Sequence, residues 1–189
     1  MQLNLPTLLT LSRIVAIPLI VVLYYVPITT ELANWTAAIL FIVFAITDWL
    51  DGYLARKLGQ ASAFGAFLDP VADKFLVCAA LLLLVHLQRI DVFVALIIIG
   101  REIAISALRE WMARIGASKS VAVHMIGKVK TTVQMVAIPF LLFDGVLLNL
   151  FHTLVVGQVL LWIAAVLTVW SMVFYINQAS TAIKAQLQK

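Results

Sequence analysis

The sequence predicts an all-α polytopic membrane protein, and three bulk properties support that prediction. Of the 189 residues, 64% are hydrophobic and only 12% are charged, and the mean hydropathy is +1.10. Soluble domains carry about 25% charged residues, so an ordinary soluble fold is excluded. The apolar residues also fall into runs close to the length that a helix needs to cross a bilayer, about 20 residues.

The apolar runs define six expected transmembrane helices, separated by short connections. We expect these helices near residues 8–27, 35–57, 70–87, 92–112, 126–143 and 153–176. The connections are too short to hold a separate soluble domain. Residues 1–189 are therefore expected to form a single transmembrane domain.

The basic residues are distributed unevenly over the expected connections, and their distribution predicts the orientation. With the N-terminus in the cytoplasm, eleven of the thirteen Lys and Arg residues fall at cytoplasmic ends or loops. Arg89 falls on the far side, and Arg101 lies inside the fourth helix. This bias follows the positive-inside rule, so both termini are expected in the cytoplasm. The net charge of +4 indicates lipid headgroups or phosphate substrates as partners, and not nucleic acid, because no basic patch lies on a soluble face.

The first expected helix begins in a polar segment, residues 4–13. Pro6 suits an entry turn, and Thr7 or Thr10 could cap the helix or contact a ligand. Arg13 lies one to two turns inside the cytoplasmic end. At that depth a cation needs a carboxylate or phosphate partner, so we expect Arg13 to have one.

Four of the nine acidic residues surround the connection between the second and third expected helices. Asp48 and Asp51 lie one helical turn apart, and so do Asp69 and Asp73. Two such pairs on neighbouring helices would place four carboxylates around one point, where they repel strongly at low dielectric. One or two hard divalent cations, Mg²⁺ or Mn²⁺, would neutralise them. The Asp69-Pro70 pair itself resembles a helix start, with Asp69 as the cap.

Ordinary ion pairing is the alternative explanation for these carboxylates. Arg56, Lys57 and Lys74 are close enough in sequence to pair with some of them. Pairing does not explain the small residues at positions 52, 55 and 65, which let helix backbones and a ligand approach closely. Ionisable groups at membrane depth are usually functional, so a metal site at the cytoplasmic side is the favoured interpretation.

Charges on the fourth expected helix allow two interpretations. Glu102 and Arg109 share one helical face, and Arg101 and Glu110 flank them in sequence. Internal ion pairs that hold the bundle together explain the two glutamates as well as a functional role does. The two arginines could serve both purposes.

The fifth expected helix opens with Lys128 and Lys130, followed by two threonines. Two lysines and two hydroxyls at the mouth of a membrane helix could hold a phosphate, or they could be snorkelling residues. Their position opposite the acidic residues favours the phosphate. Pro139 predicts a kink in this helix. On the sixth helix, Trp162 is interpreted as an interfacial or lipid-facing anchor.

The acidic stretch resembles the signature of the CDP-alcohol phosphatidyltransferase family, D-x2-D-G-x2-A-R-x8-G-x3-D-x3-D. All eight fixed positions are met at the required spacing, by Asp48, Asp51, Gly52, Ala55, Arg56, Gly65, Asp69 and Asp73. The six-helix layout agrees with that family over almost the whole chain. The resemblance implies a membrane enzyme, a homodimer, that transfers the phosphatidyl group of CDP-diacylglycerol to an alcohol and releases CMP.

The resemblance also implies roles for individual residues. By that likeness Asp48, Asp51, Asp69 and Asp73 bind two divalent ions, Mg²⁺ or Mn²⁺, and Asp73 is also the general base. Gly52, Arg56 and Ser62 would surround the CDP group and so form the binding site for CDP-diacylglycerol. Two metal ions would neutralise the charge of the diphosphate on its attacking and leaving sides.

The acceptor is expected to be glycerol 3-phosphate. Segments 4–13, 101–110 and 127–134 resemble bacterial family members that use this acceptor, which implies a location in the bacterial inner membrane. Because glycerol 3-phosphate is a dianion, its pocket should be cationic, and Arg101, Arg109, Lys128 and Lys130 are available. Charge argues against serine as the acceptor but does not exclude inositol phosphate.

Two other classes of protein compete with this expectation. A cation transporter could use the acids to carry its ion, but such residues usually lie near the bilayer midplane, on broken helices related by repeats. Here the acids lie toward one face, and no internal repeat is visible. A membrane assembly subunit could use the charges only to hold helices together.

Overall fold

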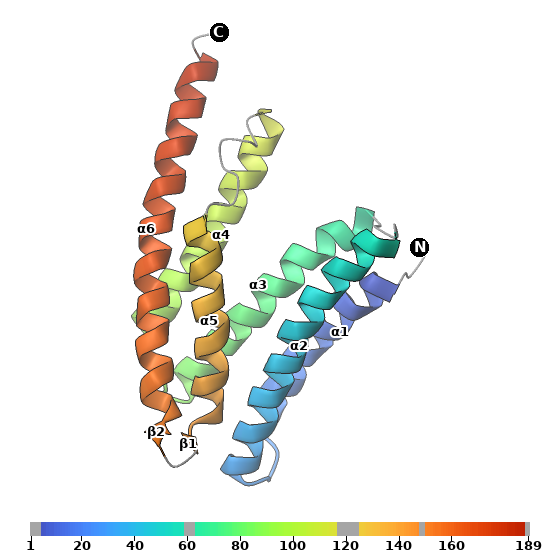
Figure 1. Ribbon diagram of the computed structural model, residues 1–189, viewed down its shortest axis with the longest axis vertical. Helices are drawn as coiled ribbons and strands as arrows, with labels where there is room; N and C mark the ends of the chain where they lie inside the picture. The colour runs from blue at the N-terminus through green and yellow to red at the C-terminus, as the bar shows by residue number, and fades with distance from the viewer. Residues whose placement is uncertain (1–4, 59–62, 117–124, 148–149, 188–189) are drawn as a thin grey trace.

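The computed structural model describes residues 5–58, 63–116, 125–147 and 150–187, and within these ranges the chain is almost entirely helical. Figure 1 shows the arrangement. The helices are α1 (Leu5–Val22), α2 (Thr30–Leu58), α3 (Ala63–His86), α4 (Val92–Arg114), α5 (Met125–Phe143) and α6 (Thr153–Leu187). A short antiparallel hairpin, β1 (Val146–Leu147) and β2 (Phe151–His152), connects α5 to α6.

The expected mainly helical architecture is confirmed, and four of the expected helix ends are wrong by five residues or more. α1 ends at Val22 and not near residue 27, because the turn that follows is itself apolar and hydropathy cannot separate it from the helix. α6 continues to Leu187 and not to about 176, because its last turns are polar and no longer resemble a membrane segment. α2 begins at Thr30 and not near residue 35, and α4 and α5 lie where the apolar runs predicted them.

The expected start of α3 is also wrong. This helix begins at Ala63, so Asp69 and Pro70 lie inside it, and Asp69 is not its cap. A proline inside a helix removes one backbone hydrogen bond, which is why the sequence indicated a helix start there. The correction matters because an aspartate that does not cap a helix is available for another role.

Local chemistry explains both ends of α4. The Asp91 side chain accepts a hydrogen bond from the backbone N–H of Phe93 at 2.7 Å and caps the first turn. The helix ends where Gly116, with a φ of +73°, adopts the left-handed conformation that glycine tolerates best.

The six helices form two groups that share one core. α1 packs against α2 and α3, α6 packs against α4 and α5, and α2 packs against α5 to join the groups. The core fills the half of the bundle near the hairpin, with Phe41, Leu81, Ile98 and Ile138 among its fully buried side chains. Toward the other end, the two groups diverge, and this end carries the start of α1 and the end of α6 (Figure 1).

Among the described residues, the most extensive contact between two helices joins α5 and α6. A Cβ atom built on Gly157 would lie 2.7 Å from Cγ of Leu141, so no larger residue fits there without movement. This contact fixes α6 against α5 at the hairpin end.

Arg89, the single cation expected on the far side, is buried in a hydrogen-bond network at the hairpin end. Its Nη1 donates to the backbone carbonyls of Leu141 and Leu142 at 3.0 and 2.8 Å, and its Nη2 donates to Asn34 Oδ1 at 2.7 Å. Its Nε lies 3.2 Å from Oδ2 of Asp144. The last carbonyls of α5 have no partner within their own helix, so the hydrogen bonds from Arg89 satisfy them. The positive charge of Arg89 also interacts favourably with the negative end of the helix dipole.

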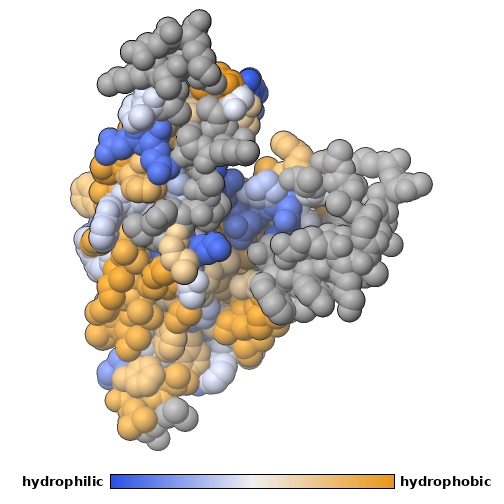
Figure 2. Space-filling view, turned by 45° about the horizontal axis from the view of Figure 1, so that its top comes forward, coloured by the Kyte–Doolittle hydropathy of each residue, from blue (hydrophilic) through white to orange (hydrophobic). Residues whose placement is uncertain are grey.

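The outer faces of the helices are unusually apolar for a protein surface. Large apolar side chains such as Val15, Leu82, Val166 and Trp170 are more than half exposed. Figure 2 shows such side chains covering much of the lower part of the visible face. In the described residues, Thr30–Thr47 of α2 and Thr153–Thr181 of α6 are long and apolar enough to cross a membrane. These features are typical of a membrane-associated protein, and six spans remain a prediction.

We expect Arg89→Leu to destabilise the protein, because Asp144 and the α5 carbonyls would lose their buried partner. Removing one partner of a buried ion pair lowers the free energy of unfolding by about 3–5 kcal/mol. Thermal unfolding in detergent would measure the loss. Arg114→Leu is the matched control, because Arg114 is exposed and its ion pair in the described part of the chain is with Glu110 on its own helix. Equal melting temperatures for the two variants would contradict the role assigned to Arg89.

Candidate active site

The acidic residues predicted to bind metal lie at the end of the bundle where the two helix groups diverge. Asp48 and Asp51 belong to the last third of α2, and Asp69 and Asp73 belong to the first half of α3. The C-terminal end of α2 and the N-terminal end of α3 lie together at that end of the molecule (Figure 1). The backbone therefore brings the two acidic segments to the same region.

Part of the predicted site lies outside the described side chains. Asp48, Asp51, Gly52 and Arg56 have a helical backbone in α2, but their side-chain positions are not described, and Ser62 lies outside the described residues altogether. Among the described side chains, no group of three metal-ligating residues is present. The structure thus describes two of the four predicted metal ligands, Asp69 and Asp73.

Asp69 is paired with Arg13 of α1, which confirms the expectation that Arg13 has an anionic partner. The Arg13 side chain is 0% exposed, and its Nη1 lies 3.6 Å from Oδ1 of Asp69. The Asp69 carboxylate is partly exposed, yet its Oδ1 is buried and accepts no hydrogen bond from the described residues. A buried carboxylate oxygen without a hydrogen bond is costly. A cation bound at that oxygen would remove the cost, so this carboxylate fits a divalent metal.

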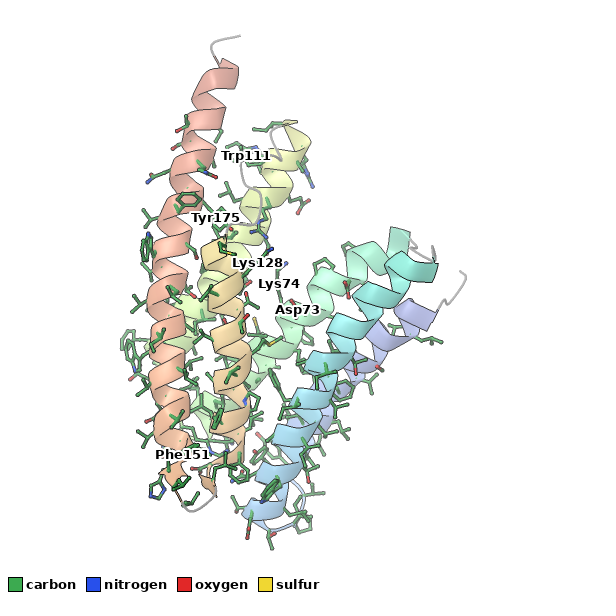
Figure 3. All side chains as sticks on the ribbon, viewed as in Figure 1. Asp73, Lys74, Trp111, Lys128, Phe151 and Tyr175 are labelled. Atoms are coloured by element: carbon green, nitrogen blue, oxygen red, sulfur yellow. The ribbon has the colours of Figure 1, made fainter. Side chains whose placement is uncertain are left out.

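Asp73 lies one turn further along α3 and faces the second helix group. In Figure 3, Asp73, Lys74 and Lys128 lie in the region between α3 and the first turns of α5. Asp73 is close enough to Lys130 of α5 to interact with it electrostatically. Figure 2 shows hydrophilic side chains gathered in the hollow between the two groups of helices. Asp73 is therefore the acidic residue that the structure places near the cations at the start of α5.

Two of the four predicted phosphate-binding cations are buried and share one counter-ion. Lys130 is 1% exposed, and its Nζ donates to Glu102 Oε1. Arg101 Nη1 donates to the same oxygen at 3.1 Å, and Arg101 Nη2 donates to Ser171 Oγ at 3.3 Å. Glu102 is therefore a structural ion-pair partner, one of the two interpretations that the sequence left open. One carboxylate for two cations leaves an excess positive charge beside Asp73.

The other two predicted cations lie further toward the open end of the bundle. Arg109 is half-buried, with its guanidinium carbon 5.2 Å from the centre of the Tyr175 ring, and Lys128 is exposed. The region thus holds these four cations, and the carboxylates described near them are Glu102, bonded to two of them, and Asp73 of α3. Such an excess of positive charge suits an anion with two negative charges.

Sequence reasoning missed the contribution of α6. Ser171 and Tyr175 are both buried and both contact Arg101. Their segment is strongly apolar overall, so it was interpreted only as a membrane span. A signal was present, because Thr168, Ser171 and Tyr175 recur at intervals of three and four residues and so form one polar stripe on the helix.

Comparisons with known proteins agree with the resemblance seen in the sequence. The model of the family described as CDP-alcohol phosphatidyltransferase matches residues 3–170. The chain is 51% identical over 181 residues to proteins named CDP-diacylglycerol–glycerol-3-phosphate 3-phosphatidyltransferase from Shigella flexneri serotype 5b (strain 8401) and Escherichia coli (strain K12). Each match covers 95% of this chain and 96% of the relative.

We expect Glu102→Gln to lower the stability of the protein, because Arg101 and Lys130 would lose the carboxylate that they share. Leaving buried charges unpaired costs about 3–5 kcal/mol. The melting temperature in detergent would report the change. Glu110→Gln serves as the control, because Glu110 is exposed and pairs only with Arg114. If both variants melted like the unmodified protein, Glu102 would not be the counter-ion that holds this cluster together.

Proposed function

We propose that this chain, which belongs to the CDP-alcohol phosphatidyltransferase family, transfers the phosphatidyl group of CDP-diacylglycerol to glycerol 3-phosphate and releases CMP. One observation carries the proposal: the chain matches relatives named for that reaction at 51% identity over 95% of its length. The full family signature between Asp48 and Asp73 and the cationic region beside it support the same reaction.

The proposed placement is in the bacterial inner membrane, as a single domain of six transmembrane helices with both termini in the cytoplasm. The uneven distribution of Lys and Arg supports this orientation. The site would then border the cytoplasmic leaflet. One substrate carries two acyl chains and the other is soluble in water, so a site at that boundary is accessible to both. We also propose that the protein is a homodimer, as the family resemblance implies.

In the proposed mechanism, Asp48, Asp51, Asp69 and Asp73 hold two divalent ions, Mg²⁺ or Mn²⁺, and Gly52, Arg56 and Ser62 lie around the CDP group. The ions supply charge neutralisation on the diphosphate of the donor. The buried Oδ1 of Asp69, which lacks a hydrogen bond from the described residues, supports its role as a ligand. Arg13 helps to hold this carboxylate in place, because its Nη1 lies 3.6 Å from Oδ1 of Asp69.

The proposed chemical step is attack by a hydroxyl of glycerol 3-phosphate on the β-phosphorus of CDP-diacylglycerol. A new P–O bond forms to the acceptor, and the P–O bond to CMP breaks with its electron pair leaving on CMP. Asp73 takes the proton of the attacking hydroxyl as general base. Its electrostatic interaction with Lys130 of the proposed acceptor pocket supports this role, because the base must reach the acceptor.

The proposed acceptor pocket consists of Arg101, Arg109, Lys128 and Lys130. The excess positive charge that remains after pairing with Glu102 favours a phosphate dianion over an acceptor with an ammonium group, such as serine. Inositol phosphate carries the same charge, so only an experiment can distinguish it from glycerol 3-phosphate as the acceptor. Lys128 and Arg109 are the more accessible of the four, so they would make the first contacts with the acceptor.

The function is tested by release of CMP from CDP-diacylglycerol and Mg²⁺ by the purified protein. We expect release with glycerol 3-phosphate and far less with serine or inositol phosphate. Asp73→Asn should reduce the rate by at least about 100-fold at an unchanged melting temperature, because it removes the proton acceptor. Preference for another acceptor would overturn the acceptor assignment. If no acceptor led to release of CMP, the proposal that the protein is this enzyme would be overturned. A cation transporter or an assembly subunit would then be favoured.

We expect Arg109→Ala and Lys128→Ala to raise the KM for glycerol 3-phosphate by about 10- to 100-fold, because each removes a charged hydrogen bond worth about 1.5–3 kcal/mol. The KM for CDP-diacylglycerol should change little. Steady-state kinetics with each substrate varied in turn would measure both constants. Arg114→Ala, an exposed arginine on the same helix, should leave both unchanged. Unaltered acceptor KM values in the first two variants would remove these residues from the pocket.

A further inference from the structure

Tyr175 of α6 lies where three helices meet in the cationic region. Its side chain is 0% exposed. Two guanidinium groups from α4 lie over its ring, with the Arg101 carbon 5.8 Å and the Arg109 carbon 5.2 Å from the ring centre. On the third helix, α5, a Cβ atom built on Gly127 would lie 3.2 Å from the Tyr175 hydroxyl. In Figure 3, Tyr175 lies on α6 near α4 and the start of α5.

This arrangement solves an electrostatic problem. Arg101 and Arg109 have like charges and lie two turns apart on α4, so they repel each other and also repel Lys130. The face of an aromatic ring is negative and attracts a guanidinium within about 6 Å of its centre, by about 2 kcal/mol where water is excluded. A ring within 6 Å of two guanidinium groups therefore attracts both without adding a charge that would compete with an incoming anion.

We propose that Tyr175 is a positioning residue that holds Arg101 and Arg109 at a fixed separation for the phosphate group of the acceptor. It acts through the two arginines and does not touch the acceptor itself. This inference rests on the proposed function, since it assigns a role within the acceptor site. It adds α6 to a site that the sequence assigned only to α2, α3, α4 and α5.

Packing alone does not explain this position. Tyr175 belongs to a small core with Ile105, Met112 and Ala179, and any large apolar side chain could fill that space. Only an aromatic ring presents a negative face to both guanidinium groups. Phenylalanine keeps that face and loses the hydroxyl, whereas leucine keeps the apolar character and loses the face. The two variants therefore separate positioning from packing.

Gly127 provides an independent way to disturb the ring. A methyl group there would lie 3.2 Å from the Tyr175 hydroxyl and 4.0 Å from Arg101 Nη2, so the ring must shift by a few tenths of an ångström to accept it. Without the hydroxyl, as in Tyr175→Phe, that contact disappears. The effect of Gly127→Ala on acceptor binding should therefore depend on the residue at position 175.

The test is steady-state kinetics of CMP release with each substrate varied. We expect Tyr175→Leu to raise the KM for glycerol 3-phosphate about tenfold, with the KM for CDP-diacylglycerol unchanged. Tyr175→Phe should remain within about twofold of the unmodified enzyme, because the ring face is retained. Met112→Leu, a change of similar volume in the same core, should alter neither KM.

The inference is overturned if Tyr175→Leu leaves the acceptor KM unchanged, or raises both KM values equally, since either result describes packing alone. If Tyr175→Leu does not fold, Gly127→Ala decides the question. It should raise the acceptor KM in the unmodified chain and have a smaller effect in the Tyr175→Phe chain, and equal effects would overturn the inference. An unmodified chain that releases no CMP would instead refute the proposed function.

Discussion

The cost of placing charge inside an apolar helix bundle organises this structure. An ion without a partner at low dielectric costs several kcal/mol, so every buried charge must meet a counter-charge or a set of hydrogen bonds. Arg13 meets Asp69 across α1 and α3, and Glu102 meets Lys130 across α4 and α5. Each pair joins helices whose apolar faces could otherwise pack in several registers. Charge pairing as well as apolar packing thus constrains how these helices meet.

The two ends of the bundle satisfy this constraint in different ways. At the hairpin end, Arg89 makes three hydrogen bonds and one ion pair, which bind Asn34, the last turn of α5 and Asp144 to one another. At the other end, the charges are only partly neutralised. Oδ1 of Asp69 accepts no hydrogen bond from the described residues, and two cations share Glu102. A saturated network stabilises the fold, whereas an unsaturated one can still bind a ligand.

The sequence predicted the helices and the acidic pairs well, because both depend on local patterns. Runs of apolar residues locate membrane helices, and a spacing of three or four residues places two carboxylates on one helical face. The expected start of α3 was wrong because Pro70 resembles a helix boundary, although α3 begins at Ala63 and continues through Pro70. Arg13 pairs with Asp69, and Tyr175 contacts two arginines, although these partners are far apart in the chain. No local pattern contains that information.

The central claim is that the carboxylates of α2 and α3 gather divalent ions at one end of the bundle. Binding of Mn²⁺ to the purified protein, followed by electron paramagnetic resonance without substrate, tests this claim without depending on turnover. The account predicts two Mn²⁺ ions per chain and a clear loss of binding in Asp69→Asn at an unchanged melting temperature. If the unmodified protein bound no more Mn²⁺ than a chain with all four aspartates changed to asparagine, the account would be contradicted.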